Sequence, residues 1–197
     1  MPRMSKLGFP SSRDPVEAET MGLVPGDTFK LSELLQAALV PSENDAADSL
    51  AITDSGSVSA FTDKMNAKMA QWGISGTHFA SASGLADSDN YSTAAALAKI
   101  AGLALINPVI GETVSKPAIS VTSGAGRTYN LKSTNNLLAS GQFYGIKTGY
   151  TLLAGECFVG LARINGHDVI TVVLGSNDRF GATTTLTNFI GRTWQWL

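Results

Sequence analysis

The chain has 197 residues, of which 44% are hydrophobic and 15% charged, and its formal net charge is -2. This length and composition predict one folded domain over residues 1–197 and exclude a disordered chain. The 14 lysine and arginine residues are scattered and form no basic stripe, so we expect no nucleic-acid partner.

The N-terminal stretch 1–10 matches no pattern and is left unassigned. "MPRMSKLGFPSSRDP" lacks the apolar core of a signal peptide, and the sequence contains no run of 18 apolar residues. We therefore expect neither an export signal nor a membrane-spanning segment in this chain.

Four helical segments are expected before residue 110. The first, "LSELLQAAL", has apolar residues at helical spacing and is closed by Pro41. The second, "NDAADSLA", begins with Asn44 or Asp45 as its N-cap. "SVSAFTDKMNAKMAQWG" and "YSTAAALAKIAGLALINP" follow, and the last of these is expected to stop at Pro108.

From residue 119 onward the pattern is typical of paired strands. "AISVT" and "RTYNL" flank the turn "SGAG", and "GECFVGLARI" and "HDVITVVLG" flank "NG". The final segment, "TTLTNFIGRTWQWL", is apolar at helical spacing and has one basic residue, Arg192, which favours packing on the sheet over membrane binding. The residues expected to face the sheet are Leu186, Phe189, Ile190, Trp194 and Leu197.

The fold class that follows is α+β, with an antiparallel β-sheet flanked by helices. The closing helix should cover one face of the sheet and the helical cluster the other. Cys157 lies in an apolar strand and is expected to be a small core residue. One cysteine and two histidines supply no recognisable metal site, so neither a metal nor another cofactor is expected.

Two stretches carry residues suited to chemistry. "VPSENDAADSL" places Ser42, Asn44 and Asp45 directly after Pro41. "YGIKTGYTLLAG" places an ammonium and a hydroxyl beside a glycine, which leaves room for a ligand to approach the backbone. Such a strand edge suits a carboxylate. Taken alone, each stretch could equally be a well-capped helix or the tight start of a strand.

Together these motifs resemble the serine D-Ala-D-Ala carboxypeptidases, the low-molecular-mass penicillin-binding proteins with a β-lactamase-like fold. The matching pieces are "GLVPGDTFKLSELLQAALVPSENDAADSLA", "SGLADSDNYSTAAALAKIA" and "STNNLLASGQFYGIKTGYTLLAGECFVGLARINGHDVITVVLGS", in the order of the family. They cover roughly residues 22 to 178. The resemblance implies acyl transfer on peptidoglycan stem peptides, β-lactams as ligands and a location in the cell envelope.

The resemblance also implies roles for individual residues. Ser42 and Asn44 match the Ser-x-Asn motif, in which the serine relays a proton and the asparagine contacts substrate. Lys147, Thr148 and Gly149 match the Lys-Thr-Gly motif, which binds the terminal carboxylate. The backbone N–H of Tyr150 would form half of an oxyanion hole.

The nucleophile of the family belongs to a Ser-x-x-Lys motif, in which one helical turn brings the lysine amine beside the serine hydroxyl. None of the eight lysines in this sequence has serine three places before it. We expect the N-terminal strands of the family to be missing as well, which would expose a sheet edge that a homo-oligomer could cover.

Three interpretations stay open: an inactive fragment, a module that binds D-Ala-D-Ala peptides or β-lactams, and an ester hydrolase with Ser42 as nucleophile and Lys147 as base. The last two require the Ser42 hydroxyl to lie within about 3 Å of the Lys147 amine. Outside the family, a Ser-His-Asp hydrolase would have to use His78 or His167. The sequence contains no G-x-S-x-G motif to support it.

Overall fold

The computed structural model describes residues 4–6, 19–85 and 89–194. The chain divides into two compact units, each built from two segments of the sequence. Unit 1 comprises Met1–Ser92 and Ala118–Ser133, and unit 2 comprises Thr93–Pro117 and Thr134–Leu197. One domain over the whole chain therefore stays a prediction. Most of the unassigned stretch 1–10, and Leu197, lie outside the described residues.

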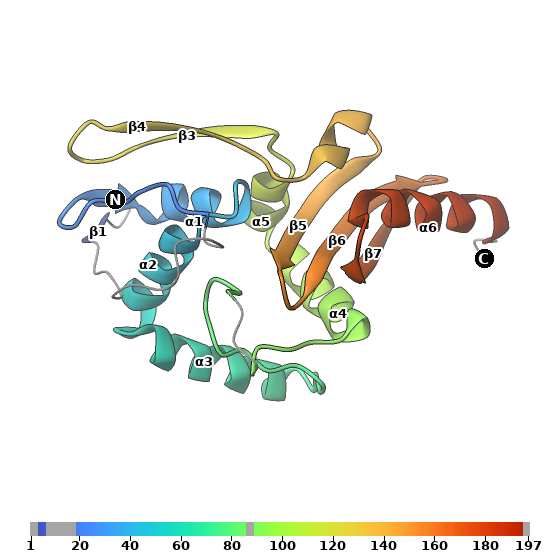
Figure 1. Cartoon of the computed structure of the whole chain (residues 1–197), viewed down its shortest axis with the longest axis horizontal. Coiled ribbons are helices and arrows are strands. Elements are labelled where there is room, and N and C mark those ends of the chain that lie inside the picture. Colours follow the sequence, from blue (N-terminus) through green and yellow to red (C-terminus); the bar gives the residue numbers. More distant parts are fainter. Residues whose placement is uncertain (1–3, 7–18, 86–88, 195–197) are drawn as a thin grey trace. The chain divides into compact units, whose positions relative to one another are not determined.

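Unit 1 combines three helices with two short two-stranded antiparallel sheets, of which β3–β4 is a hairpin (Figure 1). Its elements are β1 (Met4–Lys6), β2 (Thr28–Lys30), α1 (Leu31–Leu39), α2 (Asn44–Ser55), α3 (Val58–Gln71), β3 (Ala118–Thr122) and β4 (Thr128–Lys132). Strand β1 pairs with β2, and β3 with β4. The first three helical segments and the first hairpin agree with the sequence-based expectation.

The core of unit 1 joins the two segments of the sequence that form it. Phe29 and Leu34 are fully buried, and Val121 on β3 is 1% exposed. Leu34 and Ala37 are three residues apart, so they lie on the same face of α1. Ile119 and Val121 alternate with exposed residues along β3, so one face of the hairpin joins this core.

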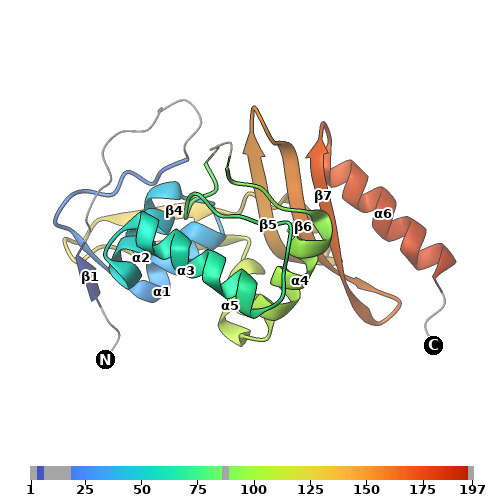
Figure 2. The ribbon, with the colours of Figure 1, turned by 90° about the horizontal axis from the view of Figure 1, so that it is seen from below.

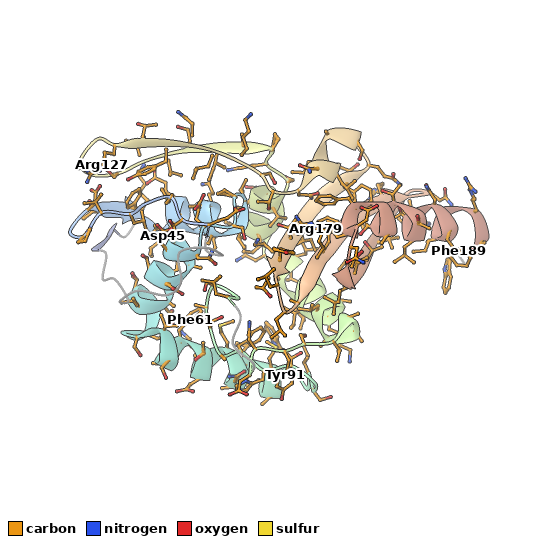
Figure 3. All side chains as sticks on the ribbon, in the orientation of Figure 1. Asp45, Phe61, Tyr91, Arg127, Arg179 and Phe189 are labelled. Carbon is orange, nitrogen blue, oxygen red and sulfur yellow. The ribbon has the colours of Figure 1, made fainter. Side chains whose placement is uncertain are left out.

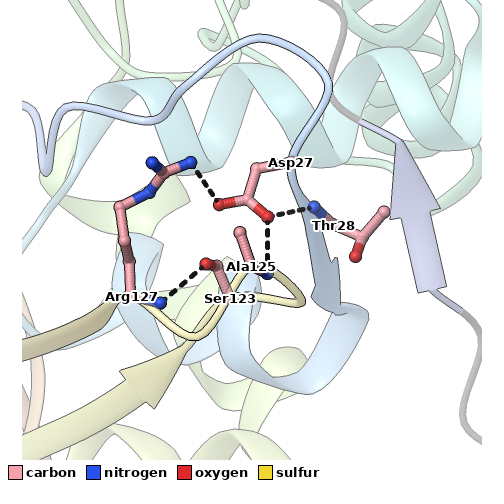
Figure 4. A network of polar contacts seen from close by, with 5 residues as sticks. All are labelled: Asp27, Thr28, Ser123, Ala125 and Arg127. Carbon is pink, nitrogen blue, oxygen red and sulfur yellow. Dashed lines mark hydrogen bonds and ion pairs between the residues drawn. The ribbon is translucent and has the colours of Figure 1, made fainter.

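A buried carboxylate, that of Asp27, ties the turn of the β3–β4 hairpin to the residues before β2 (Figure 4). It accepts hydrogen bonds from the N–H groups of Thr28 and Ala125, at 2.8 and 3.2 Å, and from the Arg127 guanidinium at 3.0 Å. A hydrogen bond from Ser123 is the largest of the effects that lower the pKa of Asp27 from 3.8 to about 2; burial opposes them. The ionised form is therefore the one that the native state favours.

Unit 2 is a three-stranded antiparallel sheet, in the order β5-β6-β7, between helices (Figure 2). Its elements are α4 (Ala94–Leu105), α5 (Pro108–Val114), the 3₁₀ helix η1 (Asn136–Ser140), β5 (Phe143–Thr151), β6 (Gly155–Ile164), β7 (His167–Ser176) and α6 (Arg179–Thr193). Asn165 and Gly166 both have positive φ, as the two-residue "NG" hairpin turn requires.

The two faces of this sheet are covered by different helices. Ala162 and Ile164 point to the face that packs against Ile190 of α6. Leu161 pairs with Ile170 on the opposite face, where Ile170 lies against Gly102 of α4. The closing helix therefore covers one face, as expected, and α4 covers the other.

Two details differ from expectation. Helix α4 ends at Leu105, before Pro108 as expected, but Asn107 caps a further helix, α5, in which proline occupies a first-turn position where it needs no N–H. The buried residues of α6 are Thr183 and Thr187, and not most of the apolar ones. Phe189 is 61% exposed and points away from the helix (Figure 3).

The two buried threonines of α6, Thr183 and Thr187, both have hydrogen-bonded hydroxyl groups. Thr183 donates to the carbonyl of Arg179 at 2.7 Å, and Thr187 to that of Thr183 at 3.1 Å. Each side chain therefore satisfies its polar group within the helix and presents its methyl group to the sheet.

Within the described ranges, no single helix is long and apolar enough to cross a membrane. Helices α4 and α5 pass the same test of length and composition only when taken together, and they are bent by 111° at their junction.

Because the pKa of Asp27 is lower in the native state than in an unfolded chain, its contribution to stability is complete above about pH 4. It is lost as the pH falls through about 2. Asp27→Asn should therefore lower the urea midpoint at pH 7 and flatten its dependence on pH between 4 and 2. The matched control is Asp63→Asn at an exposed position of α3. An Asp27→Asn profile parallel to that of the wild type would contradict this role.

Candidate active site

The Ser-x-Asn motif lies in the connection between α1 and α2. Pro41 cannot continue α1, and Ser42 has a φ of +75°, a left-handed conformation that is uncommon for residues other than glycine. The N-cap of α2 is Glu43, not Asn44 or Asp45 as expected, and its side chain makes no capping hydrogen bond. The reversal of the chain thus occurs within the motif itself.

Asn44 is held through both its backbone and its side chain. The carbonyl of Glu19 accepts a hydrogen bond from the Asn44 backbone N–H at 2.8 Å and another from Nδ2 at 3.0 Å. The orientation of the Asn44 amide is therefore set by the segment that begins at Glu19.

Asp45 binds that same segment and does not cap the helix. Its carboxylate accepts hydrogen bonds from the backbone N–H groups of three consecutive residues, Met21, Gly22 and Leu23, at 3.1 to 3.3 Å. Successive N–H groups of this kind form an anion-binding concavity. Asp45 and Asn44 together attach residues 19–23 to the first turn of α2. Ala46 is fully buried in the core of unit 1.

The Lys-Thr-Gly motif lies on β5, an edge strand of the described sheet. The Lys147 ammonium donates to the carbonyl of Thr148 at 2.9 Å. The Thr148 side chain is buried, and its hydroxyl oxygen lies 2.5 Å from that of Thr134. Because one hydroxyl of such a pair donates to the other, the accepting hydroxyl keeps its own hydrogen for a further partner.

Gly149 is exposed, and nothing inside the protein requires it to be glycine. Its φ is not in the left-handed region, and a Cβ placed on it would meet Cys157 Cβ at an ordinary 3.7 Å. Gly145 on the same strand differs, because its φ is +147° and a Cβ there would lie 2.7 Å from Val114 Cγ2. The absence of a side chain at Gly149 thus leaves space on the outside of the protein.

Arg179, at the start of α6, is a functional candidate that the sequence interpretation missed (Figure 3). Its Nη1 donates to the carbonyl of Gly149 at 2.9 Å, and its backbone N–H donates to Glu156 at 2.9 Å. The pairing of Tyr150 with Glu156, and of Glu156 with Ser176, brings the residues after β7 beside this end of β5. The "NG" turn sets the β6–β7 pairing as far as Phe158 and Val173, and a bulge then shifts it by one residue at Glu156, so the sequence signal for Arg179 was only partial.

The residues expected in one site divide between the two units. Ser42 and Asn44 belong to unit 1, whereas Lys147, Thr148, Gly149 and Tyr150 belong to unit 2 together with Arg179. The structure brings the members of each half together. The distance of about 3 Å between the Ser42 hydroxyl and the Lys147 amine stays a prediction.

The histidines of the rival interpretation occupy structural positions. His78 forms an isolated bridge with Tyr91, stacks on its ring at 5.8 Å, and bonds through Nδ1 to the Asp89 carbonyl at 2.7 Å. His167 begins β7, opposite Ile164. Among the described residues, no group of three or more His, Cys, Asp or Glu side chains is placed to hold a metal ion.

Comparison with known proteins identifies the family. The sequence profile described as D-alanyl-D-alanine carboxypeptidase matches residues 9–178. The chain belongs to the D-alanyl-D-alanine carboxypeptidase family. A curated D-alanyl-D-alanine carboxypeptidase of Streptomyces sp. (strain K15) is 37% identical over 166 residues, which are 78% of this chain and 57% of that protein. A D-alanyl-D-alanine endopeptidase of Escherichia coli (strain K12) is 34% identical, over 77% of this chain and 49% of that protein.

Solved structures of the family share the fold. The Streptomyces K15 DD-transpeptidase has a TM-score of 0.80 and 33% identity, covering 87% of this chain and 71% of that one. Penicillin-binding protein D2 of Listeria monocytogenes, in its cefotaxime-bound form, has a TM-score of 0.80 and 33% identity, covering 95% and 76%. The α+β, DD-peptidase-like fold is therefore confirmed. The chain spans about half the length of the curated relatives it matches.

Removal of the Asp45 carboxylate should release residues 19–23 and leave three N–H groups without their acceptor. Asp45→Ala is expected to lower the free energy of unfolding by about 2 kcal/mol, as is typical of hydrogen bonds to a charged group. Urea unfolding at pH 7 measures the change, with Asp63→Ala on α3 as the exposed control. Equal effects of the two substitutions would show that the carboxylate does not hold the segment.

Proposed function

We propose that this chain acts as a serine-type D-Ala-D-Ala carboxypeptidase domain, and that it binds the D-Ala-D-Ala end of peptidoglycan stem peptides and β-lactams. The family supports this proposal. The observation in this chain that supports it is the set of groups around Gly149. An exposed glycine that the fold does not need is flanked by Lys147 and Thr148 and bonded by Arg179.

The terminal carboxylate of the ligand would bind at this end of β5. Lys147 and Arg179 supply positive charge, and the Thr148–Thr134 pair supplies a directed hydroxyl donor. The edge strand can add an extended peptide by backbone hydrogen bonds, and the missing side chain of Gly149 lets that peptide come close. The Tyr150 backbone N–H would then hold the oxyanion of the scissile carbonyl.

The Ser-x-Asn motif would complete the site, with the Asn44 amide binding the ligand and the Ser42 hydroxyl relaying a proton. Peptidoglycan lies outside the cytoplasmic membrane, so this function implies a location in the cell envelope. A second copy of the chain at the free edge of β7 is a further expectation that belongs to this proposal.

The strained backbone of Ser42 favours one variant of this function, in which Ser42 is the nucleophile. Positive φ at residues other than glycine is concentrated at functional sites. In this variant Lys147 is uncharged, and Arg179 supplies the positive charge for the carboxylate. Ser42 Oγ would attack the carbonyl carbon as its proton passes to the neutral Lys147 amine. The C–N bond then breaks, the amine leaves with that proton, and an ester remains on Ser42.

A fluorescent penicillin tests both the binding and the ester. We expect saturable binding by fluorescence anisotropy, weakened about 10- to 100-fold in Lys147→Ala because a charge-assisted hydrogen bond is lost. Lys132→Ala, at an exposed position of β4, should bind like the wild type. Absence of binding, or equal binding by Lys147→Ala, would remove the proposed function.

The same mixture, denatured and measured by intact mass, shows whether an ester forms. An adduct that maps to Ser42 and disappears in Ser42→Ala would establish Ser42 as the nucleophile. Binding without an adduct would support the ligand-binding site and exclude Ser42 as the nucleophile.

Gly149→Ala separates ligand binding from folding. The added methyl group meets only ordinary contacts within the protein, so the free energy of unfolding should change by less than about 0.5 kcal/mol. Penicillin binding should weaken at least tenfold, because the methyl group occupies the space left for the ligand. Gly145→Ala is the matched contrast, since its Cβ would collide with Val114. Unchanged binding by a folded Gly149→Ala would contradict this placement of the ligand.

A further inference from the structure

Glu43, the middle residue of the Ser-x-Asn motif, carries a buried carboxyl group. The residue is 7% exposed, and among the described residues its Oε2 has no hydrogen-bond partner. Its N–H donates to the Ala37 carbonyl, and its own carbonyl accepts from Ala47. The backbone of Glu43 is therefore held in place between Ser42 and Asn44, while one of its carboxyl oxygens is buried without a donor.

The charges that act on Glu43 are both negative. They belong to Asp45, in the first turn of α2, and to Glu19, in the segment attached to that turn. Burial, and then these two carboxylates, raise the pKa of Glu43 from 4.5 to about 7. The cations of the neighbouring elements are engaged elsewhere: Lys30 with Glu33, Lys64 with Asp54, and Lys68 over the Trp72 ring. The remaining charged groups on α2 and α3 are Asp48 and Asp63.

The segment that carries Glu19 also orients Asn44. The Glu19 carbonyl accepts both hydrogen bonds from Asn44, and Asp45 holds Met21 to Leu23. A charge on Glu43 would leave its buried Oε2 without a donor from the described residues and would be repelled by Glu19. The free-energy cost of this buried charge is removed when the segment opens and water reaches the carboxylate.

We propose that Glu43 is a positioning residue for Asn44: its neutral carboxyl lets residues 19–23 close over the first turn of α2, and its ionisation releases them. Opening is accompanied by the loss of one proton from Glu43. The closed form fixes the Asn44 amide with Nδ2 bonded to Glu19, so its Oδ1 faces a ligand in one orientation. The consequence for ligand binding rests on the proposed function, whereas the opening itself does not.

The dependence on pH has a definite sign and window. The closed form holds the proton up to about pH 7, and the open form releases it near 4.5. The equilibrium constant for opening should therefore rise about tenfold per pH unit between these values and level off above them. The closed form is therefore most stable, relative to the open form, below about pH 4.5.

Hydrogen exchange of the whole chain, followed by mass spectrometry or NMR, tests the opening. The amides of Met21, Gly22, Leu23 and Asn44 report it, after correction for the intrinsic exchange rate at each pH. Between pH 5 and 7 their protection should fall about 40-fold in the wild type. Protection that does not change over this range would overturn the proposal.

Variants separate positioning from general stability. Glu43→Gln removes the titrating group with little change of shape, so its protection should be independent of pH. Glu112→Gln, at an exposed position of α5, should behave like the wild type. If the amides of β6 lost protection in parallel with those of residues 21–23, Glu43 would act on global unfolding, and the proposal would be wrong.

Penicillin binding at pH 6 and pH 8 distinguishes this inference from the proposed function. Weaker binding by the wild type at pH 8, restored in Glu43→Gln, supports both. If the segment opens with rising pH but penicillin binds at neither pH, the result supports the positioning of Asn44 and contradicts the proposed function. Binding without opening defeats the inference alone.

Discussion

The Asp27 carboxylate joins stretches of chain that lie 100 residues apart in the sequence. The chain leaves unit 1 after Ser92 and returns at Ala118, and the return is secured where Asp27 accepts N–H groups from both sides. Once the hairpin is docked, Val121 closes the core over Phe29 and Leu34. That core fixes α1, and the end of α1 sets the position from which the Ser42 connection departs.

The two halves of the candidate site differ in their electrostatic character. The half around Asn44 contains the carboxylates of Glu19, Glu43 and Asp45. Asp45 accepts three backbone N–H groups, whereas Oε2 of Glu43 has no hydrogen-bond partner in the described part of the chain. The half on β5 carries the cations Lys147 and Arg179 beside an exposed backbone. A peptide that ends in a carboxylate and carries an internal amide requires both kinds of group, which is the combination that the proposed function uses.

Local signals in the sequence were sufficient for the elements whose boundaries are set by one or two residues. Pro41 ended α1, and Asn165 with Gly166 set the β6–β7 turn. The fold class and the Lys-Thr-Gly strand could be predicted for the same reason, since both rest on short motifs in a fixed order. The division into two units could not, because it depends on which distant segments share a core.

The errors arose where tertiary contacts outweigh local preference. Asp45 is a residue type that often caps helices, but its carboxylate accepts hydrogen bonds from the N–H groups of residues 21–23 and does not cap α2. Helix α4 ends before Pro108 as expected, but helix α5 was missed because Asn107 caps it and proline fits its first turn. Arg179 was missed because its role depends on a strand register and not on its neighbours in sequence.

The buried threonines of α6 reverse the usual arrangement of an amphipathic helix. With Thr183 and Thr187 facing the sheet, Leu186, Phe189 and Trp194 are left in contact with water. Apolar surface of this kind promotes self-association of a protein in concentrated solution. The helix that closes unit 2 thus carries apolar surface that favours self-association, and a polar substitution at Phe189 would reduce it without touching the packed face.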